Sequence, residues 1–174
     1  MTRMSQPHGR EERDGSRAAS NAADDALETT FVELYRTQFT EMVRLAAILL
    51  GSDASAEDLV HDAFLRVHAR WRTVEHPRAY LRRVVVNACR TSRQRLWRER
   101  RASQSTLVPV ADLEANELFD ALAKLPYRQR AAIVLRYYEG LTYAEIADAL
   151  QCPEGTAASL INRGTAQLRR TVGQ

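Results

Sequence analysis

The sequence predicts an all-α protein with two small helical domains joined by a short flexible linker. Apolar residues recur at three- and four-residue steps through most of the chain, and nothing in the pattern resembles a pair of strands. A stretch without helical period, which contains a proline, separates the two helical parts. The length of 174 residues suits two small domains with modest cores.

Charge is distributed unevenly along the chain, although the formal net charge is only +3. Between Arg66 and Arg101 there are twelve arginines and two acidic residues, whereas the first 28 residues carry six acidic and four basic groups. One central segment is therefore strongly basic. Lys124 is the sole lysine, which a GC-rich coding sequence explains as readily as a preference for phosphate.

Nothing in the composition predicts a cofactor, a metal site or a membrane segment. Cys89 and Cys152 lie far apart and neither belongs to a Cys-X-X-Cys or His/Cys cluster, so neither a disulfide framework nor a zinc site is indicated. Both cysteines fall where packed residues are expected, and we predict that they are inert. The apolar stretches are far shorter than the roughly 20 residues of a membrane span, so we expect a cytoplasmic protein.

The N-terminal part is predicted to be a tail followed by a three-helix domain over residues 28–101. Residues 1–27 mix small, polar and charged residues without periodicity, which is typical of a disordered tail. The first helix ends at Gly51, the second follows Ser55 as its N-cap, and Pro77 opens the third. The positions expected to face inward in the second and third helices are Leu59, Val60, Ala63, Phe64, Val67, Trp71, Tyr80, Leu81, Val84, Val85 and Ala88.

The C-terminal part is predicted to be a linker followed by a second helical domain. Residues 102–112 have no helical period and contain Pro109, so we interpret them as the linker. The second domain is expected over residues 113–174. Its first helix stops at Pro126, and Gly140 is placed to terminate the next one.

A helix-turn-helix is predicted near the C-terminus. Thr142 and Glu145 have the spacing of a capping box, and Leu141 with Ile146 that of a hydrophobic staple, so the start of a helix is well specified. A second helix is expected over residues 154–170, packed through Ala157, Ile161, Gly164 and Leu168. Small Ala147 would lie where the two helices approach most closely. From the pattern alone, a helical hairpin that only packs stays open as the alternative to DNA binding.

Three segments resemble conserved regions of sigma-70-family RNA polymerase sigma factors. Residues 125–150, LPYRQRAAIVLRYYEGLTYAEIADAL, are similar to the fourth conserved region of that family. Residues 56–67, AEDLVHDAFLRV, resemble the segment that docks on the clamp helices of the largest polymerase subunit. Residues 76–87, HPRAYLRRVVVN, with the arginines that follow, resemble the segment that opens and reads the −10 element. With no further domain between them, this order resembles the extracytoplasmic-function group.

The resemblance implies three sets of site residues. Core-polymerase binding falls to a helical stripe at i, i+3, i+4 and i+7, namely Asp58, His61, Asp62 and Leu65. Binding of −10 DNA falls to Tyr80, Arg82, Arg83, Asn87, Arg90 and Arg93. Reading of the −35 element in the major groove falls to Thr156, Ser159, Asn162, Arg163 and Gln167.

The basic segment has the chemistry needed to hold a melted strand. Nine arginines between Arg78 and Arg101 would neutralise phosphates, while the rings of Tyr80 and Trp97 offer faces for unstacked bases. Sigma factors of this type do not hydrolyse ATP, so binding of the single strand must supply the energy that opens the duplex.

Each functional assignment has a purely structural alternative. Asp58 could only stabilise the start of its helix, and Asp62 could be an ordinary solvated charge. A lone exposed histidine such as His61 is usually just polar surface. Asn87 could equally be a core amide bonded to a neighbouring loop.

The sequence departs from its relatives in the second DNA-binding helix. Ala158 and Leu160 stand where similar proteins often carry Lys or Arg, and Ala157 stands where Val is common. We therefore expect weaker and less salt-sensitive −35 binding than in a typical relative. Thr91, where many relatives have Asp, is a lesser departure.

The implied partners are core RNA polymerase, through its clamp helices and flap, and promoter DNA in the nucleoid, with an anti-sigma factor left open as a third. No enzyme is predicted, because the chain has no Gly-rich phosphate loop, no Gly-X-Ser-X-Gly and no metal-ligand spacing. The alternatives are a conventional helix-turn-helix regulator that acts without core polymerase and a protein-binding adaptor that sequesters another transcription factor.

Overall fold

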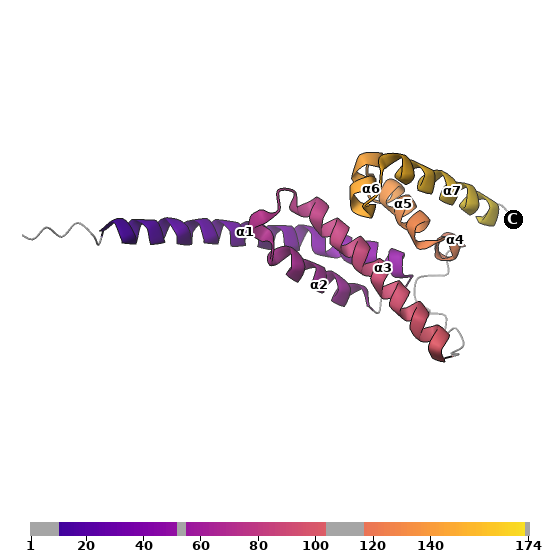
Figure 1. The fold of residues 1–174 in the computed structure, drawn as a ribbon, viewed down its shortest axis with the longest axis horizontal. Helices are drawn as coiled ribbons and strands as arrows, with labels where there is room; N and C mark the ends of the chain where they lie inside the picture. Colours follow the sequence, from indigo (N-terminus) through magenta and orange to yellow (C-terminus); the bar gives the residue numbers. More distant parts are fainter. Residues whose placement is uncertain (1–10, 52–54, 104–116, 173–174) are drawn as a thin grey trace, which may run out of the picture.

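The computed structural model of the chain describes residues 11–51, 55–103 and 117–172, and every regular element among them is helical, as predicted (Figure 1). The N-terminal unit consists of α1 (Glu11–Leu50), α2 (Ala56–His68), the short 3-10 helix η1 (Trp71–Thr73) and α3 (Pro77–Ser103). The C-terminal unit consists of α4 (Glu117–Lys124), α5 (Tyr127–Tyr137), α6 (Tyr143–Leu150) and α7 (Glu154–Val172). Most of the predicted linker, including Pro109, lies outside the described residues. Leu113, at the start of the predicted second domain, also lies outside them.

Helices α1, α2 and α3 pack around an apolar core. Leu45, Val60 and Val85 contribute one fully buried side chain from each helix. The predicted end of α1 is confirmed, because Gly51 has φ of +75° and its N–H donates to Ala47 O at 2.8 Å. A glycine adopts this left-handed conformation without strain, so the helix terminates at this residue.

The first helix starts earlier than the sequence predicts. The disordered tail was expected over residues 1–27, whereas α1 begins at Glu11. The stretch from 11 to 27 projects from the body of the molecule (Figure 1). It contains five alanines, the residue with the highest helix propensity, which favours extension of a helix that has already formed.

The start and end of α2 differ in detail from the prediction. Ser55 occupies the N-cap position but its side chain makes no capping hydrogen bond. Glu57 and Asp58 lie in the first turn, where their charge is favourable to the helix dipole. Trp71 belongs to η1 and not to α2, and its ring contacts Phe31 edge-on at 5.2 Å.

Helix α3 buries a wider face than predicted. Of the positions expected to face inward, Tyr80, Val84 and Ala88 are only half-buried. Val86 and Cys89, on another side of the helix, are buried instead. Tyr127 of α5 lies against this side, and its hydroxyl donates to Val86 O at 2.6 Å. The second unit therefore covers a face of α3 that a separate three-helix domain would leave in water.

The helix-turn-helix forms as predicted. The Thr142 hydroxyl accepts from the Glu145 N–H at 3.3 Å, and the Glu145 carboxylate accepts from the Thr142 N–H at 2.8 Å, which completes the capping box. These hydrogen bonds lower the pKa of Glu145. Gln151 ends α6 in the left-handed conformation with φ of 49°. Gly164 lets α7 approach α5, since a Cβ there would lie 2.5 Å from Ile133 Cδ1.

The two units pack against each other through α1, α3, α5 and α6 (Figure 1). A single cluster of buried apolar side chains extends from the N-terminal unit into the C-terminal unit, with Leu135 and Ile146 among its members. The two units therefore share one boundary.

Candidate functional site

The predicted stripe on α2 faces solvent. Asp58, His61, Asp62 and Leu65 are all exposed, and Leu65 keeps 64% of its surface accessible. The ring of His61 lies edge-on to Tyr35 and Phe39, with centroids 5.8 and 5.6 Å apart, so its orientation is fixed by α1. The stripe thus presents two carboxylates, an anchored imidazole and an apolar side chain on one helical face.

A hollow of about 470 Å³ lies between this stripe and α3. Asp58 and Asp62 form part of one wall, while Val84, Asn87 and Leu96 belong to the other. The acidic stripe and the third helix therefore border a common groove.

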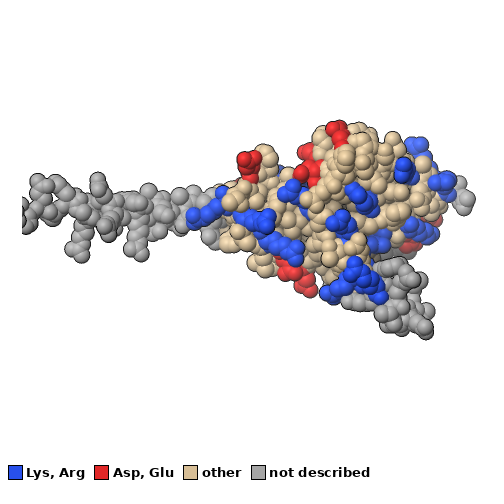
Figure 2. Space-filling view, viewed as in Figure 1, with Lys and Arg blue, Asp and Glu red and all other residues tan. Residues whose placement is uncertain are grey.

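The predicted −10 residues do not share one environment. Arg90 is exposed, whereas Arg93 is half-buried and donates to Leu50 O at the end of α1, at 3.3 Å. The side chain of Trp97 lies outside the described residues. On the face of the molecule shown in Figure 2, basic side chains are more widespread than acidic ones.

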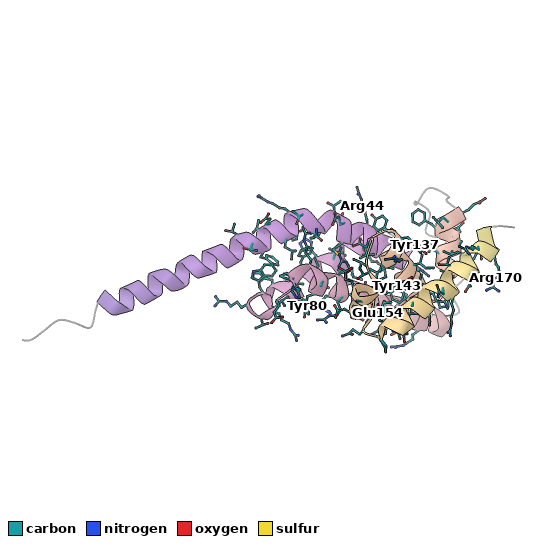
Figure 3. All side chains as sticks on the ribbon, turned by 90° about the horizontal axis from the view of Figure 1, so that it is seen from above. Arg44, Tyr80, Tyr137, Tyr143, Glu154 and Arg170 are labelled. Atoms are coloured by element: carbon teal, nitrogen blue, oxygen red, sulfur yellow. The ribbon has the colours of Figure 1, made fainter. Side chains whose placement is uncertain are left out.

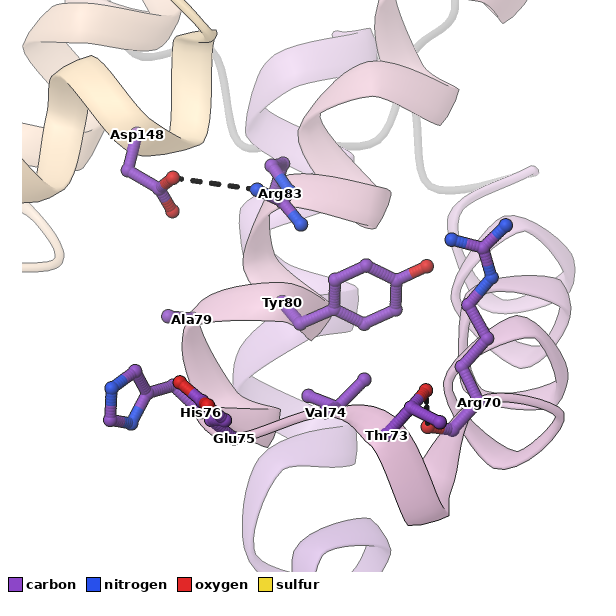
Figure 4. A pocket seen from close by; sticks show the side chains of 9 residues that line it. All are labelled: Arg70, Thr73, Val74, Glu75, His76, Ala79, Tyr80, Arg83 and Asp148. Carbon is purple, nitrogen blue, oxygen red and sulfur yellow. Dashed lines mark hydrogen bonds and ion pairs between the residues drawn. The ribbon is translucent and has the colours of Figure 1, made fainter.

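Tyr80 and Arg83 form a second hollow with the C-terminal unit (Figure 4). The guanidinium of Arg83 lies 5.1 Å from the centre of the Tyr80 ring, within reach of a cation–π contact. Its Nη1 atom is 3.4 Å from Asp148 Oδ1 of α6. The hollow has a volume of about 450 Å³, and Asp148 reaches its edge from across the boundary.

Two more of the predicted −10 residues contact the C-terminal unit. Arg82 Nε lies 3.3 Å from Glu139 Oε2, and the side chains of this pair are only 16% and 9% exposed. Burial raises the pKa of Glu139, and the adjacent Arg82 opposes that rise. Asn87 Nδ2 donates to Gln151 Oε1 at 3.4 Å. The tertiary structure brings Arg82 and Asn87 together with residues on either side of α6, a proximity that the sequence analysis did not predict.

The predicted −35 residues line the outer side of α7. Ser159, Asn162 and Arg163 are exposed, while Thr156 and Gln167 are half-buried. The Ser159 hydroxyl donates to Gly155 O of its own helix. In Figure 3 side chains line α7 from Glu154 at its start to Arg170 near its end.

The packing of α7 also accounts for its unusual residues. Ala157 and Ile161 are buried, as the helix-turn-helix pattern predicts. Ala158 is half-buried, and half-buried Leu160 packs against the main core. The leucine therefore contributes to packing at a position where relatives often have a basic residue.

Arg130 is a functional candidate that the sequence analysis missed. Its side chain is fully buried and donates to Leu49 O at 3.0 Å and to Ala123 O at 2.8 Å, with a longer bond of 3.4 Å to Leu125 O. Burial and, secondarily, the nearby Arg93 lower the pKa of Arg130 to about 10, so it stays charged at neutral pH. The signal in the sequence is the adjoining run of apolar residues, 131–135, which is buried throughout.

Other chemistry is limited in the part of the chain that the structure describes. No group of three or more His, Cys, Asp or Glu side chains there could hold a metal ion. Within the same residues, no helix combines the length and the apolar character of a membrane span. Burial raises the pKa of Cys89 to about 12, so its thiol stays protonated at neutral pH.

Family models match both units. The model for sigma-70 region 2 matches residues 34–99, and the model for sigma-70 region 4 matches residues 115–168. The chain is 35% identical over 155 residues to the RNA polymerase sigma-E factor of Streptomyces coelicolor, covering 80% of this chain and 84% of that protein. It is 33% identical over 174 residues to the ECF RNA polymerase sigma factor SigM of Mycobacterium tuberculosis, covering 95% of this chain and 88% of that protein.

Solved structures show the same fold. The sigma factor RpoE of Bartonella quintana, in complex with the anti-sigma factor NepR, has a TM-score of 0.71 at 22% identity and covers 83% of this chain and 97% of its own. CnrH, in complex with the cytosolic domain of CnrY, has a TM-score of 0.62 at 26% identity over 84% of this chain and 89% of its own.

These matches extend over both units in the order that the sequence motifs predict. They do not favour the alternative of a conventional regulator, because region 2 accounts for the N-terminal unit. The chain therefore belongs to the sigma-70 family, in its extracytoplasmic-function group, and is a sigma factor that directs RNA polymerase to promoters.

Proposed function

We propose that the α2 stripe docks this sigma factor on core RNA polymerase. The observation that carries the proposal is the alignment of exposed Asp58 and Asp62 with Leu65, which is 64% exposed, along one helical face. A single exposed leucine is ordinary surface. Two carboxylates in line with it form a surface suited to a helical partner with basic residues around an apolar strip.

The −10 strand is assigned to the side of α3 that carries Tyr80 and Arg83. The tyrosine ring borders a hollow open to solvent, and the guanidinium beside it suits a phosphate. Arg82 and Asn87 belong to the same interface, and exposed Arg90 extends the basic surface along α3. Arg93 is the least suited of the set to bind DNA, because its side chain already donates a hydrogen bond to Leu50 O.

The −35 element is assigned to α7. Exposed Asn162 and Arg163 supply hydrogen-bond donors for base edges or phosphates, and Ser159 and Gln167 lie on the same outer surface. With no basic residue at positions 158 and 160, the electrostatic contribution to binding is small.

Each of the two units has its own proposed binding functions. Residues 28–101 would carry docking and −10 recognition, 102–112 the linker, and 113–174 the −35 element, with the flap of the polymerase as a further contact. The family consists of transcription initiation factors, and we propose that this chain catalyses no reaction and acts in the cytoplasm, at the nucleoid. An anti-sigma partner stays a prediction.

The test of docking is competition with a housekeeping sigma factor for sigma-free core RNA polymerase. The double variant Asp58→Arg, Asp62→Arg should lose at least about tenfold in affinity, since like charges would face the basic partner. The matched control, Glu33→Arg with Glu57→Arg, makes the same change in net charge at exposed positions outside the stripe. Glu57 also matches Asp58 in its place near the start of α2.

Retained competition by the control and loss by the stripe variant would support the docking surface. Equal competition by the two variants would contradict a role for the α2 stripe in docking. Failure of the unmodified chain to bind core at all would remove the proposed docking.

A further inference from the structure

We propose that the end of α7 holds the sugar-phosphate backbone of duplex DNA beside the −35 element, through Arg169 and Arg170. Neither arginine belongs to the set predicted to read the −35 bases. The inference rests on the proposed binding of DNA by α7. It adds a second contact, with the backbone, that does not depend on base sequence.

The two arginines continue the outer surface of α7. Arg169 and Arg170 follow Asn162 and Arg163 by seven residues each, which is about two helical turns, so the two pairs lie on the same side of the helix. All four side chains are exposed. In Figure 3 Arg170 lies near the end of α7, away from the N-terminal unit. The surface predicted to bind DNA therefore extends to basic residues near the end of the helix.

Helix α7 is longer than the groove that it is proposed to enter. Its 19 residues span about 28 Å along the axis. The major groove of duplex DNA is about 12 Å wide. In helix-turn-helix proteins the N-terminal residues of the second helix contact the base edges. The C-terminal turns then lie beyond the bases, where the phosphates at the edge of the groove are the groups within reach.

No carboxylate neutralises these two arginines in the part of the chain that the structure describes. Glu154, the sole acidic residue of α7, is at its opposite end. Helix α4 packs against α7 and carries Glu117 and Asp120, but neither of them forms an ion pair with Arg169 or Arg170. The side chain of Arg170 donates one hydrogen bond, from Nε to a main-chain carbonyl of its own helix at 3.3 Å. Its two terminal amino groups can therefore donate to a phosphate.

This end of the helix supplies charge that the middle of the helix lacks. Ala158 and Leu160 bring none, and Arg163 is the single basic residue of the predicted −35 set. With Arg169 and Arg170, the number of phosphates that α7 can neutralise rises from one to three. Because the salt dependence of binding is proportional to this number, most of it would come from the end of the helix.

The structural alternative is that the two arginines only stabilise the helix. Both lie in the last turn, where positive charge is favourable to the helix dipole without any ligand. Such a role affects the stability of the fold and leaves the salt dependence of DNA binding unchanged. An acidic protein surface as the ligand would also leave it unchanged. The salt dependence, measured on folded variants, therefore separates the backbone contact from both.

The test variant is Arg169→Gln with Arg170→Gln in the full-length chain, bound to a duplex of mixed sequence. The slope of log affinity against log salt should become shallower by about 1.8, since two fewer phosphates are neutralised. Affinity should fall by the same factor on two duplexes of unrelated sequence, because phosphates carry no sequence information. The pair Arg169→Lys with Arg170→Lys should retain the slope, because lysine brings the same charge. Circular dichroism would verify that the helices persist.

Two reference variants make the result specific. Arg36→Gln with Arg44→Gln makes the same change in net charge at exposed positions of α1 and should leave the slope nearly unchanged. Arg163→Gln removes one charge from the predicted −35 set and should make the slope shallower by about 0.9.

A shallower slope for the variant at the end of α7, with no change in the α1 control, would support the backbone contact. Slopes equal to that control, together with a shallower slope for Arg163→Gln, would overturn the contact and leave the proposed −35 binding in place. If Arg163→Gln also had no effect, both the backbone contact and the proposed function of α7 would fail.

Discussion

The predicted DNA face of α3 and that of α7 differ in charge and in access. On α3, Arg82 and Arg83 are engaged by carboxylates from the other unit. On α7, Asn162 and Arg163 are exposed, and Ala158 and Leu160 bring no charge. The predicted DNA face with more basic residues is in contact with the C-terminal unit, and the other predicted face is exposed and weakly charged.

A basic segment of the sequence does not by itself form a basic surface that is free to bind DNA. Guanidinium groups are satisfied by any oxyanion within reach, including carboxylates of the same chain. Because burial raises the pKa of Glu139, this carboxyl group loses its charge at a higher pH than an ordinary one.

The largest effect should come from removing the buried cation that links the end of α1 to the C-terminal unit. Arg130→Ala deletes a fully buried side chain and leaves the carbonyls of Leu49 and Ala123 without this donor. We expect the free energy of unfolding to fall by about 3 kcal/mol, after partial relief from losing a buried charge. Urea unfolding followed by circular dichroism measures this change.

Arg128→Ala is the matched control, because Arg128 is an exposed residue of the same helix with a long 3.4 Å bond to Leu150 O. Its loss should stay below about 1 kcal/mol. If both variants lost the same stability, Arg130 would have no special part in joining α1 to the C-terminal unit.

A smaller effect on stability is expected where α7 packs against α5. Gly164→Ala would place a Cβ 2.5 Å from Ile133 Cδ1 and 3.3 Å from Gln129 Cβ. Overpacking should exceed the gain in helix propensity and lower the free energy of unfolding by about 1 kcal/mol. Thermal unfolding would report it as a lower Tm.

Two comparisons test the cause. Gly155→Ala, with no neighbouring atom within 4 Å of the new Cβ, should be neutral or stabilising. Adding Ile133→Val removes the clashing Cδ1 atom and should recover part of the loss caused by Gly164→Ala. A loss of equal size for both glycines would point to the helix backbone and not to contact between α5 and α7.

The smallest effect concerns the charge on the outer side of α7. Ala158→Arg should steepen the slope of log affinity against log salt by about 0.9 for binding to a mixed-sequence duplex, since one more phosphate is neutralised. Leu160 is left in place, because it packs against the core. Ala123→Arg, exposed on α4, adds the same charge elsewhere, and an equal change in slope for both variants would contradict a role for position 158 in DNA contact.

The local features of the fold were predictable because their causes lie within a few residues. The capping box of Thr142 with Glu145 and the stop at Gly51 follow from side-chain and backbone chemistry over a single turn. The N-terminal start of α1 was not, since residues 11–27 contain five alanines but have no apolar period. Apolar periodicity detects a helix only where one of its faces is apolar.

The all-helical fold, the helix-turn-helix, the polar stripe on α2 and the resemblance to the family could be predicted from the sequence, because each depends on residues close together along the chain. Which polar side chains have hydrogen-bond partners in the other unit depended on the tertiary structure. Arg82, Arg83 and Asn87 meet partners 57, 65 and 64 residues away, and Arg130 meets Leu49 across 81 residues. Such contacts depend on how two units pack, and a pattern that repeats every few residues carries no information about a partner that far along the chain.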